Sequence, residues 1–163
     1  MLALRAYHEA DRTACWHVFF RAVHEGAAGF YTPEQRQAWA PRQTVPDGPD
    51  KLLTQHCIVA ERAGRIVGFM SLTDAGYLDM AFVLPEEMGK GTAAALHDAV
   101  ITHATDTGLA ARVTTHASHL FRRFLLRQGW QVVAAETVER DGERLDRFVM
   151  DRVLPTGDAR ATA

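Results

Sequence analysis

Segment 77–93 combines residues whose types and spacing suit the binding of a phosphate group. An apolar stretch, Tyr77–Leu84, is followed by Pro85, then by Gly89 and Gly91, and then by a helix-forming run. Glycines let backbone N–H groups approach an anion closely, and the first turn of a helix adds N–H groups without intrahelical partners and the positive end of the helix dipole. The spacing therefore predicts a pyrophosphate site at this loop.

Two widespread phosphate loops have a different spacing. The ATPase loop requires Gly-Lys-Ser/Thr, whereas Lys90 is followed by Gly91. The dinucleotide fingerprint requires three glycines at the start of a parallel βαβ unit, and this segment has Gly89 and Gly91 past the middle of the chain. The loop thus represents another class, in which Lys90 is expected to meet a phosphate.

Composition and charge favour a small-molecule partner. The chain has 163 residues, 47% of them hydrophobic, and a formal charge of −2 with dispersed basic residues, so we expect one domain and no nucleic-acid partner. Met1–Tyr7 is too short for a secretory signal, and no apolar run approaches the roughly 20 residues that span a bilayer. We expect a cytoplasmic protein without a membrane partner.

Cysteines and histidines give no metal or disulfide pattern. Cys15 and Cys57 are far apart, each in an apolar context, which favours reduced, buried thiols. The eight histidines are scattered, and none falls in a His-Glu-x-x-His or Cys-x-x-Cys arrangement. No metal is predicted.

Apolar periodicity and turn residues predict an α+β domain with a mixed, mostly antiparallel sheet of six to seven strands flanked by helices. We expect one domain over residues 1–154 and a disordered tail over 155–163. The predicted strands are Leu2–Tyr7, His56–Arg62, Arg65–Leu72, Tyr77–Leu84, Ala110–Thr115, Trp130–Val138 and Leu145–Val153. The predicted helices are Ala10–Glu25, one that follows a Thr32 cap and ends near Trp39, Thr92–Thr107, and one from a Ser118 cap to Arg127.

Two segments resemble motifs of the GCN5-related N-acetyltransferases (GNAT family). Gly89 and Gly91 fit the acetyl-CoA loop Gln/Arg-x-x-Gly-x-Gly/Ala, although Glu86 stands where the family usually has Gln or Arg. A carboxylate is unfavourable beside phosphates unless it points away. Residues 118–130 resemble the helix Asn-x-x-Ala-x-x-Phe-Tyr-x-Lys-x-Gly-Phe, with Leu125 in place of the Tyr that often protonates the departing thiolate.

The order of the predicted elements is also that of the family. The resemblance therefore implies the acyl-CoA N-acyltransferase fold, a three-layer α/β/α sandwich, over nearly the whole chain. Short matches point to the bacterial branch of the YafP type: residues 21–23, 31–35 with Trp39, 79–83, and a C-terminal strand over 142–150.

The resemblance implies transfer of an acetyl group from acetyl-CoA to a primary amine by direct attack, with both substrates bound together. A backbone N–H of Phe82 or Val83 is expected to polarise the thioester carbonyl. Carried over residue by residue, the cofactor-binding positions are Phe82, Val83, Met88, Gly89, Lys90, Gly91, Thr92, Ala93, Ser118, Phe121 and Arg123. Arg122 is an alternative to Arg123 for the adenosine end.

Four residues are candidates for proton transfer. Asp79, a charged residue in an apolar strand, is the expected base; alternation of the strand could instead turn it toward solvent or a partner Arg. Tyr31 is a candidate acid or a packing residue. His119, with His116, could protonate the thiolate or be an ordinary surface histidine.

Several alternatives stay open at this stage. The loss of the tyrosine at Leu125 keeps a non-catalytic acyl-CoA-binding or regulatory module as the second hypothesis, and a protein partner on an edge strand as a third. A polyamine, an amino sugar, an amino acid and a protein amine are all open as the acceptor. Family members often pair through their C-terminal strands, which makes a homodimer one option.

Overall fold

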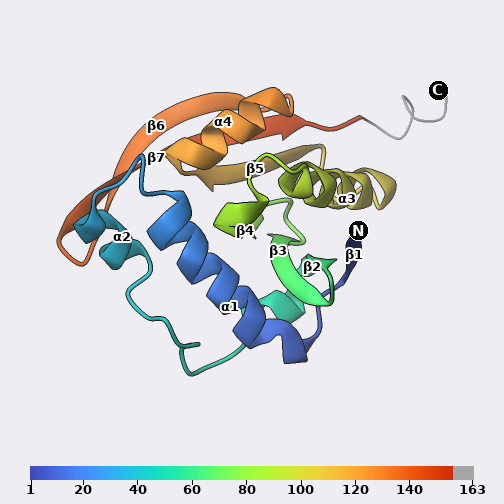
Figure 1. Cartoon of the computed structure of the whole chain (residues 1–163). Helices are drawn as coiled ribbons and strands as arrows, with labels where there is room; N and C mark the ends of the chain where they lie inside the picture. Colours follow the sequence, from blue (N-terminus) through green and yellow to red (C-terminus); the bar gives the residue numbers. More distant parts are fainter. Residues whose placement is uncertain (156–163) are drawn as a thin grey trace.

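The structure, a computed structural model, describes residues 1–155 (Figure 1). Residues 156–163, in the tail expected to be disordered, lie outside the described residues. The strands are β1 (Leu2–Ala6), β2 (His56–Arg62), β3 (Arg65–Leu72), β4 (Leu78–Val83), β5 (Arg112–Ala117), β6 (Gln131–Arg140) and β7 (Glu143–Val153). The helices are α1 (Arg12–Arg21), α2 (Pro33–Trp39), α3 (Thr92–Asp106) and α4 (His119–Arg127).

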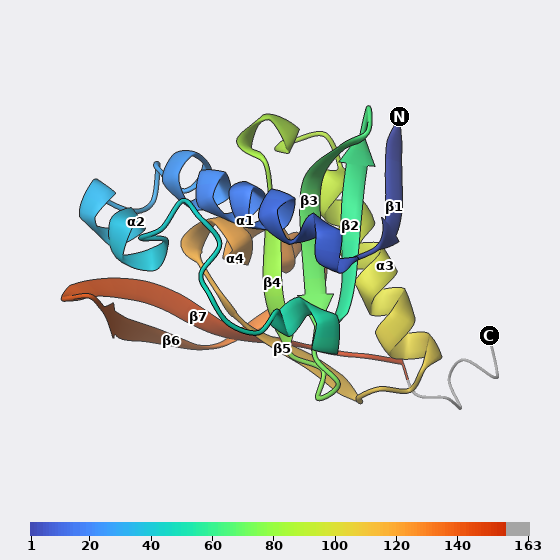
Figure 2. The same cartoon turned by 90° about the horizontal axis from the view of Figure 1, so that it is seen from below.

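The strands form two antiparallel sheets, in the orders β1-β2-β3-β4 and β5-β7-β6. A parallel bridge between Tyr77 and Thr114 joins them, and the hydroxyl of Thr115 donates to the carbonyl of Leu78 at 2.7 Å. Figure 2 shows β6 and β7 running across the direction of β1–β4. The predicted α+β class is confirmed. Strands β4 and β5 meet at the Tyr77–Thr114 bridge and diverge toward their other ends.

A β-bulge at Asp79 changes which backbone groups of β4 face its open edge. Ser71 pairs with Met80 and Leu72 with Leu78, so Asp79 has no partner residue on β3. The N–H of Leu84 donates to Val67 on the β3 side at 2.8 Å. Because backbone direction alternates along a strand, the N–H of Phe82 also faces β3, and those of Ala81 and Val83 face the open edge.

Caps and turns place the helices as their sequences predict. The hydroxyl of Thr32 accepts from the N–H of Gln35 at 3.1 Å, and the Gln35 side chain accepts from the N–H of Thr32 at 2.9 Å, which completes a capping box at α2. Ser118 caps α4 by accepting from the N–H of Phe121 at 3.2 Å. The helix predicted over residues 10–25 is confirmed with irregular ends: a 3-10 turn at Glu9–Asp11 (η1) and a π-helical turn at Ala22–Gly26 (η2).

Helices cover both faces of the first sheet around one apolar core. Figure 1 shows α1 and α3 on opposite sides of β2–β4, which gives the predicted α/β/α layering. Val18 of α1, Phe69 of β3 and Leu96 of α3 are each almost fully buried in this core. Within residues 1–155, no helix combines the length and apolar character needed to cross a bilayer.

Candidate active site

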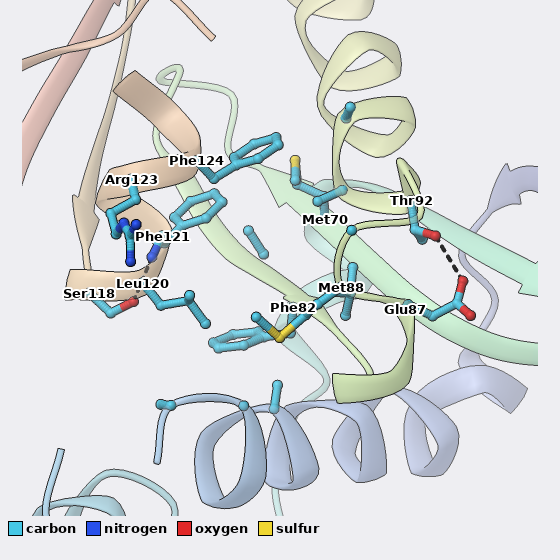
Figure 3. A pocket seen from close by; sticks show the side chains of 18 of the residues that line it. Met70, Phe82, Glu87, Met88, Thr92, Ser118, Leu120, Phe121, Arg123 and Phe124 are labelled. Carbon is cyan, nitrogen blue, oxygen red and sulfur yellow. Dashed lines mark hydrogen bonds between the residues drawn. The ribbon is translucent and has the colours of Figure 1, made fainter. Parts of the chain in front are cut away.

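A cavity of about 460 Å³ opens where β4 and β5 diverge. Its walls come from β4, the loop before α3, one face of α4, and the η2 and α2 segments (Figure 3). Every predicted cofactor-binding residue except Lys90 lines this cavity. The structure therefore brings together two motifs that lie about 25 residues apart in the sequence.

The glycine loop has the backbone geometry that its sequence predicts. Gly89 and Gly91 have φ values of 80° and 83°, in the left-handed region that side chains rarely adopt. A Cβ at either position would meet nothing within 4 Å, so backbone conformation rather than crowding requires glycine. Gly91 begins α3 without a side-chain cap, which leaves the N–H groups of the first turn available to an anion.

The carboxylate of Glu87 holds this loop in place through hydrogen bonds. The Glu87 side chain is 3% exposed, and its carboxylate accepts from the hydroxyl of Thr92 at 2.8 Å (Figure 3). The same carboxylate accepts from Nε of Arg62 at 3.1 Å. Burial acts to raise the pKa of Glu87, but the hydrogen bonds from Thr92 and Arg62 hold it below its usual value. Lys90 Nζ lies 3.6 Å from Glu87, so this lysine pairs with the loop itself and does not line the cavity.

Glu86, the departure from the family pattern, points away from the loop. Its two carboxylate oxygens accept from the guanidinium of Arg21 on α1, each at 2.9 Å, and Arg65 lies 3.7 Å away. The hydrogen bonds from Arg21 lower the pKa of Glu86 to about 2. This carboxylate is therefore ionised and paired, and it does not oppose a phosphate at Gly89.

The open edge of β4 supplies the second backbone element. Of the two residues expected to polarise a carbonyl, Val83 directs its N–H to the open edge, whereas Phe82 directs its N–H to β3. The Phe82 ring contributes to the cavity wall and packs against Phe19 and Trp39, with centroids 4.9 and 6.2 Å apart. Of the two, Val83 is thus the residue whose N–H faces the open edge.

Aromatic rings on α4 form the opposite wall. Phe121 and Phe124 stack with centroids 5.7 Å apart and an interplanar angle of 8°, and both face the cavity (Figure 3). Arg123 lines the cavity and lies 5.9 Å from the centroid of Phe30, whereas Arg122 lies over Phe148 and outside the cavity. Leu125, at the family's tyrosine position, is fully buried in the core.

The structure does not bring Asp79 to the cavity. Its carboxylate accepts from Nε2 of Gln55 at 2.9 Å and lies 3.0 Å from Nζ of Lys51. The bulge explains this placement, because the extra residue in β4 turns Asp79 toward the segment that precedes β2. The partners that hold Asp79 are thus a lysine and a glutamine, in place of the arginine considered as the alternative.

Tyr31 and His119 lie together beside the cavity but do not line it. The Tyr31 hydroxyl donates to the carbonyl of Asp146 at 2.9 Å and accepts from the N–H of His119 at 3.1 Å. Burial raises the pKa of Tyr31. The His119 ring stacks on Phe30, and its Nε2 is 3.7 Å from the Asp146 carboxylate. Tyr31 is thus engaged in structural hydrogen bonds.

The other histidine candidate has a different partner. Nδ1 of His116 lies 2.7 Å from the hydroxyl of Tyr77.

Several lining residues were not predicted, and some of them had a usable signal. Phe124 and Arg127 follow Phe121 at intervals of three residues, so they share its helix face. Other lining residues adjoin these motifs in the sequence: Ala81, Glu87, Ala94, Leu120 and Gln128. The rest come from segments that the fold brings near: Ala22, Gly26, Ala27, Trp39 and Met70. In the described part of the chain, no cluster of three or more His, Cys, Asp or Glu side chains could hold a metal ion.

Comparisons with known proteins agree with this architecture. Residues 27–151 match the acetyltransferase (GNAT) domain family. The N-acetyltransferase YafP of Escherichia coli is 31% identical over 149 residues, which cover 91% of this chain and 94% of that protein. A GCN5-related N-acetyltransferase structure from Rhodopseudomonas palustris superposes with a TM-score of 0.84 at 29% identity, covering 93% and 95% of the two chains.

A more distant structure shows the same fold. The PaiA N-acetyltransferase of Thermoplasma acidophilum, solved in complex with coenzyme A, has a TM-score of 0.72 at 16% identity, and the match covers 94% of this chain and 99% of that one. The family match spans most of the sequence, and the Escherichia coli relative is similar over nearly its full length. This chain therefore belongs to the GNAT family of acetyltransferases.

Proposed function

We propose that this protein transfers an acetyl group from acetyl-CoA to a primary amine. The observation that carries the proposal is a single cavity that runs from the uncapped N-terminus of α3 to the open edge of β4. The N-terminus of α3 can bind a pyrophosphate, and the open edge of β4 offers the N–H of Val83 to a carbonyl. The proposed cofactor residues are those predicted from the sequence, with Lys90 acting through Glu87.

The proposed chemistry is direct acyl transfer. The amine nitrogen attacks the thioester carbonyl carbon, the C–S bond breaks, and CoA leaves as the thiolate, which takes up through water the one proton that the amine nitrogen loses. The N–H of Val83 stabilises the oxyanion that develops on the carbonyl. The stacked rings of Phe121 and Phe124 exclude water from one side of the pantetheine arm. Both substrates are held in one cavity, so proximity supplies much of the rate.

Isothermal titration with acetyl-CoA and with CoA tests the cofactor site. Gly89→Trp places a large side chain in the loop, and we expect it to abolish saturable binding. Gly108→Trp is the matched control, because Gly108 also has a positive φ, of 61°, a Cβ there would also meet nothing within 4 Å, and it follows the C-terminal end of α3, whereas the glycine loop precedes the N-terminal end of that helix. Wild-type protein that binds neither compound would refute the proposal.

A non-catalytic acyl-CoA-binding module is the second candidate function. It is favoured by two observations: Leu125 is buried where the family often has a tyrosine acid, and Asp79 is held by Lys51 and Gln55. Release of free CoA in the presence of amines separates the two functions. Binding without turnover of any amine would establish the module.

We propose that residues 1–154 act as one domain in the cytoplasm and that two copies pair through the second sheet. Val132 and Val133 on β6 are exposed, at 38% and 57%, on the strand that ends this sheet. Light scattering of the purified chain, compared with a Val133→Lys variant, tests the pairing. A monomer in both cases would remove the homodimer from the proposal.

A further inference from the structure

The cavity has a second end on the side of η2 and α2, which is lined by the acceptor-end residues Ala22, Gly26, Ala27 and Trp39 together with Phe82 and Met88, two residues that it shares with the cofactor end. All six residues are uncharged. The small residues come from the π-helical turn η2 and the residue that follows it, and they leave room opposite Trp39 and Phe82. At Gly26 a Cβ would only touch the sulfur of Met88, at 3.9 Å. The acceptor end of the cavity is therefore an apolar space with the small residues of η2 on one side and the rings of Trp39 and Phe82 on the other.

The aromatic rings at this end are held rigidly. Trp39 packs edge-to-face on Tyr31, with centroids 5.5 Å apart, and lies 6.2 Å from Phe82. Tyr31 is fixed in turn by its two hydrogen bonds, to the carbonyl of Asp146 and from the N–H of His119. Preorganised aromatic faces favour a flat, apolar ligand, because little side-chain freedom is lost on binding.

Charge at the cavity selects against cationic acceptors. Arg123 and Arg127 line the cavity on α4, at the cofactor end, and the carboxylate of Glu87 in the loop is engaged by Thr92 and Arg62, so the described acceptor-end residues offer no carboxylate to a further ammonium group. A polyamine or an amino sugar that carries further ammonium groups would lose hydration here without gaining an opposite charge. The acceptor end thus fits a molecule with no positive charge outside the reacting nitrogen.

The position of Asp79 narrows the choice of amine. An alkylamine resembles the lysine side chain, with a pKa near 10.4, so at neutral pH a base must remove a proton before it attacks. The carboxylate of Asp79 is bound by Lys51 and Gln55, away from the cavity. An amine attached directly to an aromatic ring delocalises its lone pair into the ring and is already neutral at that pH. Such an acceptor needs no base for this step.

Resting on the proposed function, we propose that the acceptor is an aromatic primary amine whose ring packs against the cavity-facing surfaces of Trp39 and Phe82. The nitrogen then points toward the open edge of β4, where the N–H of Val83 holds the thioester carbonyl. Trp39 is the residue that sets this specificity. The nitrogen–carbon bond forms as the C–S bond breaks, and the single displaced proton leaves to water, so no further reactant is required.

An amine panel tests the substrate class. The probes are 4-methoxyaniline and 2-aminofluorene, compared with 2-phenylethylamine, spermidine and glucosamine, and the readout is released CoA together with the mass of the acetylated product. We expect kcat/KM for the aromatic amines to exceed that for every comparator by about tenfold or more. We also expect the aromatic-amine rate to stay flat between about pH 6 and pH 9, where alkylamines deprotonate progressively.

Variants of Trp39 test the proposed ring contact. Trp39→Ala is expected to raise KM for 4-methoxyaniline about tenfold, and Trp39→Phe to retain most of the affinity, with the Kd for acetyl-CoA unchanged in both. Trp16→Phe is the control, because Trp16 lies outside the cavity and its Nε1 donates to the carbonyl of Arg42 at 2.9 Å.

The outcomes separate two kinds of failure. A preference for spermidine or glucosamine would overturn the aromatic acceptor, and a preference for 2-phenylethylamine would overturn the ring-bound amine and return a base to the mechanism. Turnover of 4-methoxyaniline that Trp39→Ala leaves unchanged would overturn the role of Trp39. Acetyl-CoA binding without turnover of any amine would overturn the acceptor class while the cofactor site stands, and absence of acetyl-CoA binding would refute the proposed function itself.

Discussion

The two ends of the cavity are built in different ways. At the cofactor end, backbone groups form the site: the glycine loop, the uncapped start of α3 and the open edge of β4. At the acceptor end, side chains from η2, α2 and β4 form it, with Trp39 and Phe82 as its largest surfaces. Backbone sites require a conformation, and few residues permit that conformation. Side-chain sites require a surface, which many residue combinations can provide.

This difference explains why one end is readable in the sequence and the other is not. Two glycines and a helix start can be recognised within ten residues, because a left-handed backbone and an exposed helix terminus are local properties. The contact between Trp39 and Phe82 joins residues 43 positions apart and depends on how α2 packs on the sheet. Predictions about the cofactor end should therefore concern the backbone, and those about the acceptor end should concern side chains.

The strongest test of the backbone site replaces one N–H. Val83→Pro removes the donor that faces the open edge and leaves the bonds between β3 and β4 in place. We expect kcat to fall by about 10²–10³-fold, the cost of losing one oxyanion donor, with little change in the Kd for acetyl-CoA. Rapid-mix kinetics and titration calorimetry measure the two quantities.

The neighbouring residue is the control for Val83. By the alternation of the strand, Phe82→Pro removes an N–H that faces β3, so we expect loss of folding rather than loss of catalysis alone. Circular dichroism distinguishes these results. A folded Phe82→Pro protein together with an unfolded Val83→Pro protein would reverse the assignment of the two backbone directions.

Acid should weaken the α4 wall of the cofactor end through His97. This residue is 1% exposed, accepts from Nε1 of Trp130 at 2.9 Å and packs edge-to-face on Phe124 at 5.7 Å. Burial, followed by the charge of Arg152, lowers the pKa of His97 to about 4. In the unfolded chain His97 therefore binds a proton near pH 6.5, whereas in the folded chain it stays neutral until about pH 4. The free energy of unfolding thus falls as the pH drops from 6.5 toward 4.

The size of this loss is bounded by the shift in pKa. A change of about 2.5 pKa units corresponds to at most about 3 kcal/mol of unfolding free energy. Urea unfolding at a series of pH values measures it, and His97→Gln should flatten the curve over this range. An unchanged slope in that variant would show that other groups cause the acid sensitivity.

Most elements follow from local patterns, and the differences have identifiable causes. The bounds of β2 and β3 agree with prediction because the Ala63-Gly64 turn fixes their register. β6 and β7 extend further than predicted because Asp141 and Gly142 both adopt positive φ, which forms a two-residue turn and lets pairing begin beside it. The apolar pattern of these strand ends is weak, so periodicity alone did not reveal them.

The position of Asp79 shows the limit of reading a strand by alternation. A charged residue in an apolar strand was a reasonable candidate base, but its direction depends on a bulge that only the pairing with β3 reveals. For Leu125, residue type alone was sufficient. The sequence alone showed that it cannot donate a proton, and the structure adds that this position faces the core. The residue type thus predicts whether a side chain can transfer a proton, but not whether that side chain faces the cavity.

Glu87 offers a milder test of the cofactor end than the backbone change. Glu87→Gln keeps the shape but removes the charge that Arg62 and the Thr92 hydroxyl bind. We expect unfolding free energy to fall by about 1–3 kcal/mol and the KM for acetyl-CoA to rise, with kcat nearly unchanged. Thermal unfolding and steady-state kinetics measure both. Arg62→Gln should give a similar KM change, whereas an effect on kcat alone would place Glu87 in the chemistry.

The smallest effect is expected at the ion pair that links the two ends. Arg21 of α1, next to η2 on the acceptor side, binds Glu86 in the turn before the glycine loop. Their side chains are 24% and 42% exposed, so solvent screens the pair and we expect a coupling of about 0.2–1 kcal/mol. A double-mutant cycle with Arg21→Ala and Glu86→Ala measures it, at low and at high salt. If the pair communicates between the ends, Glu86→Ala also changes the KM of the amine; if it only stabilises the fold, the thermal midpoint shifts and that KM does not.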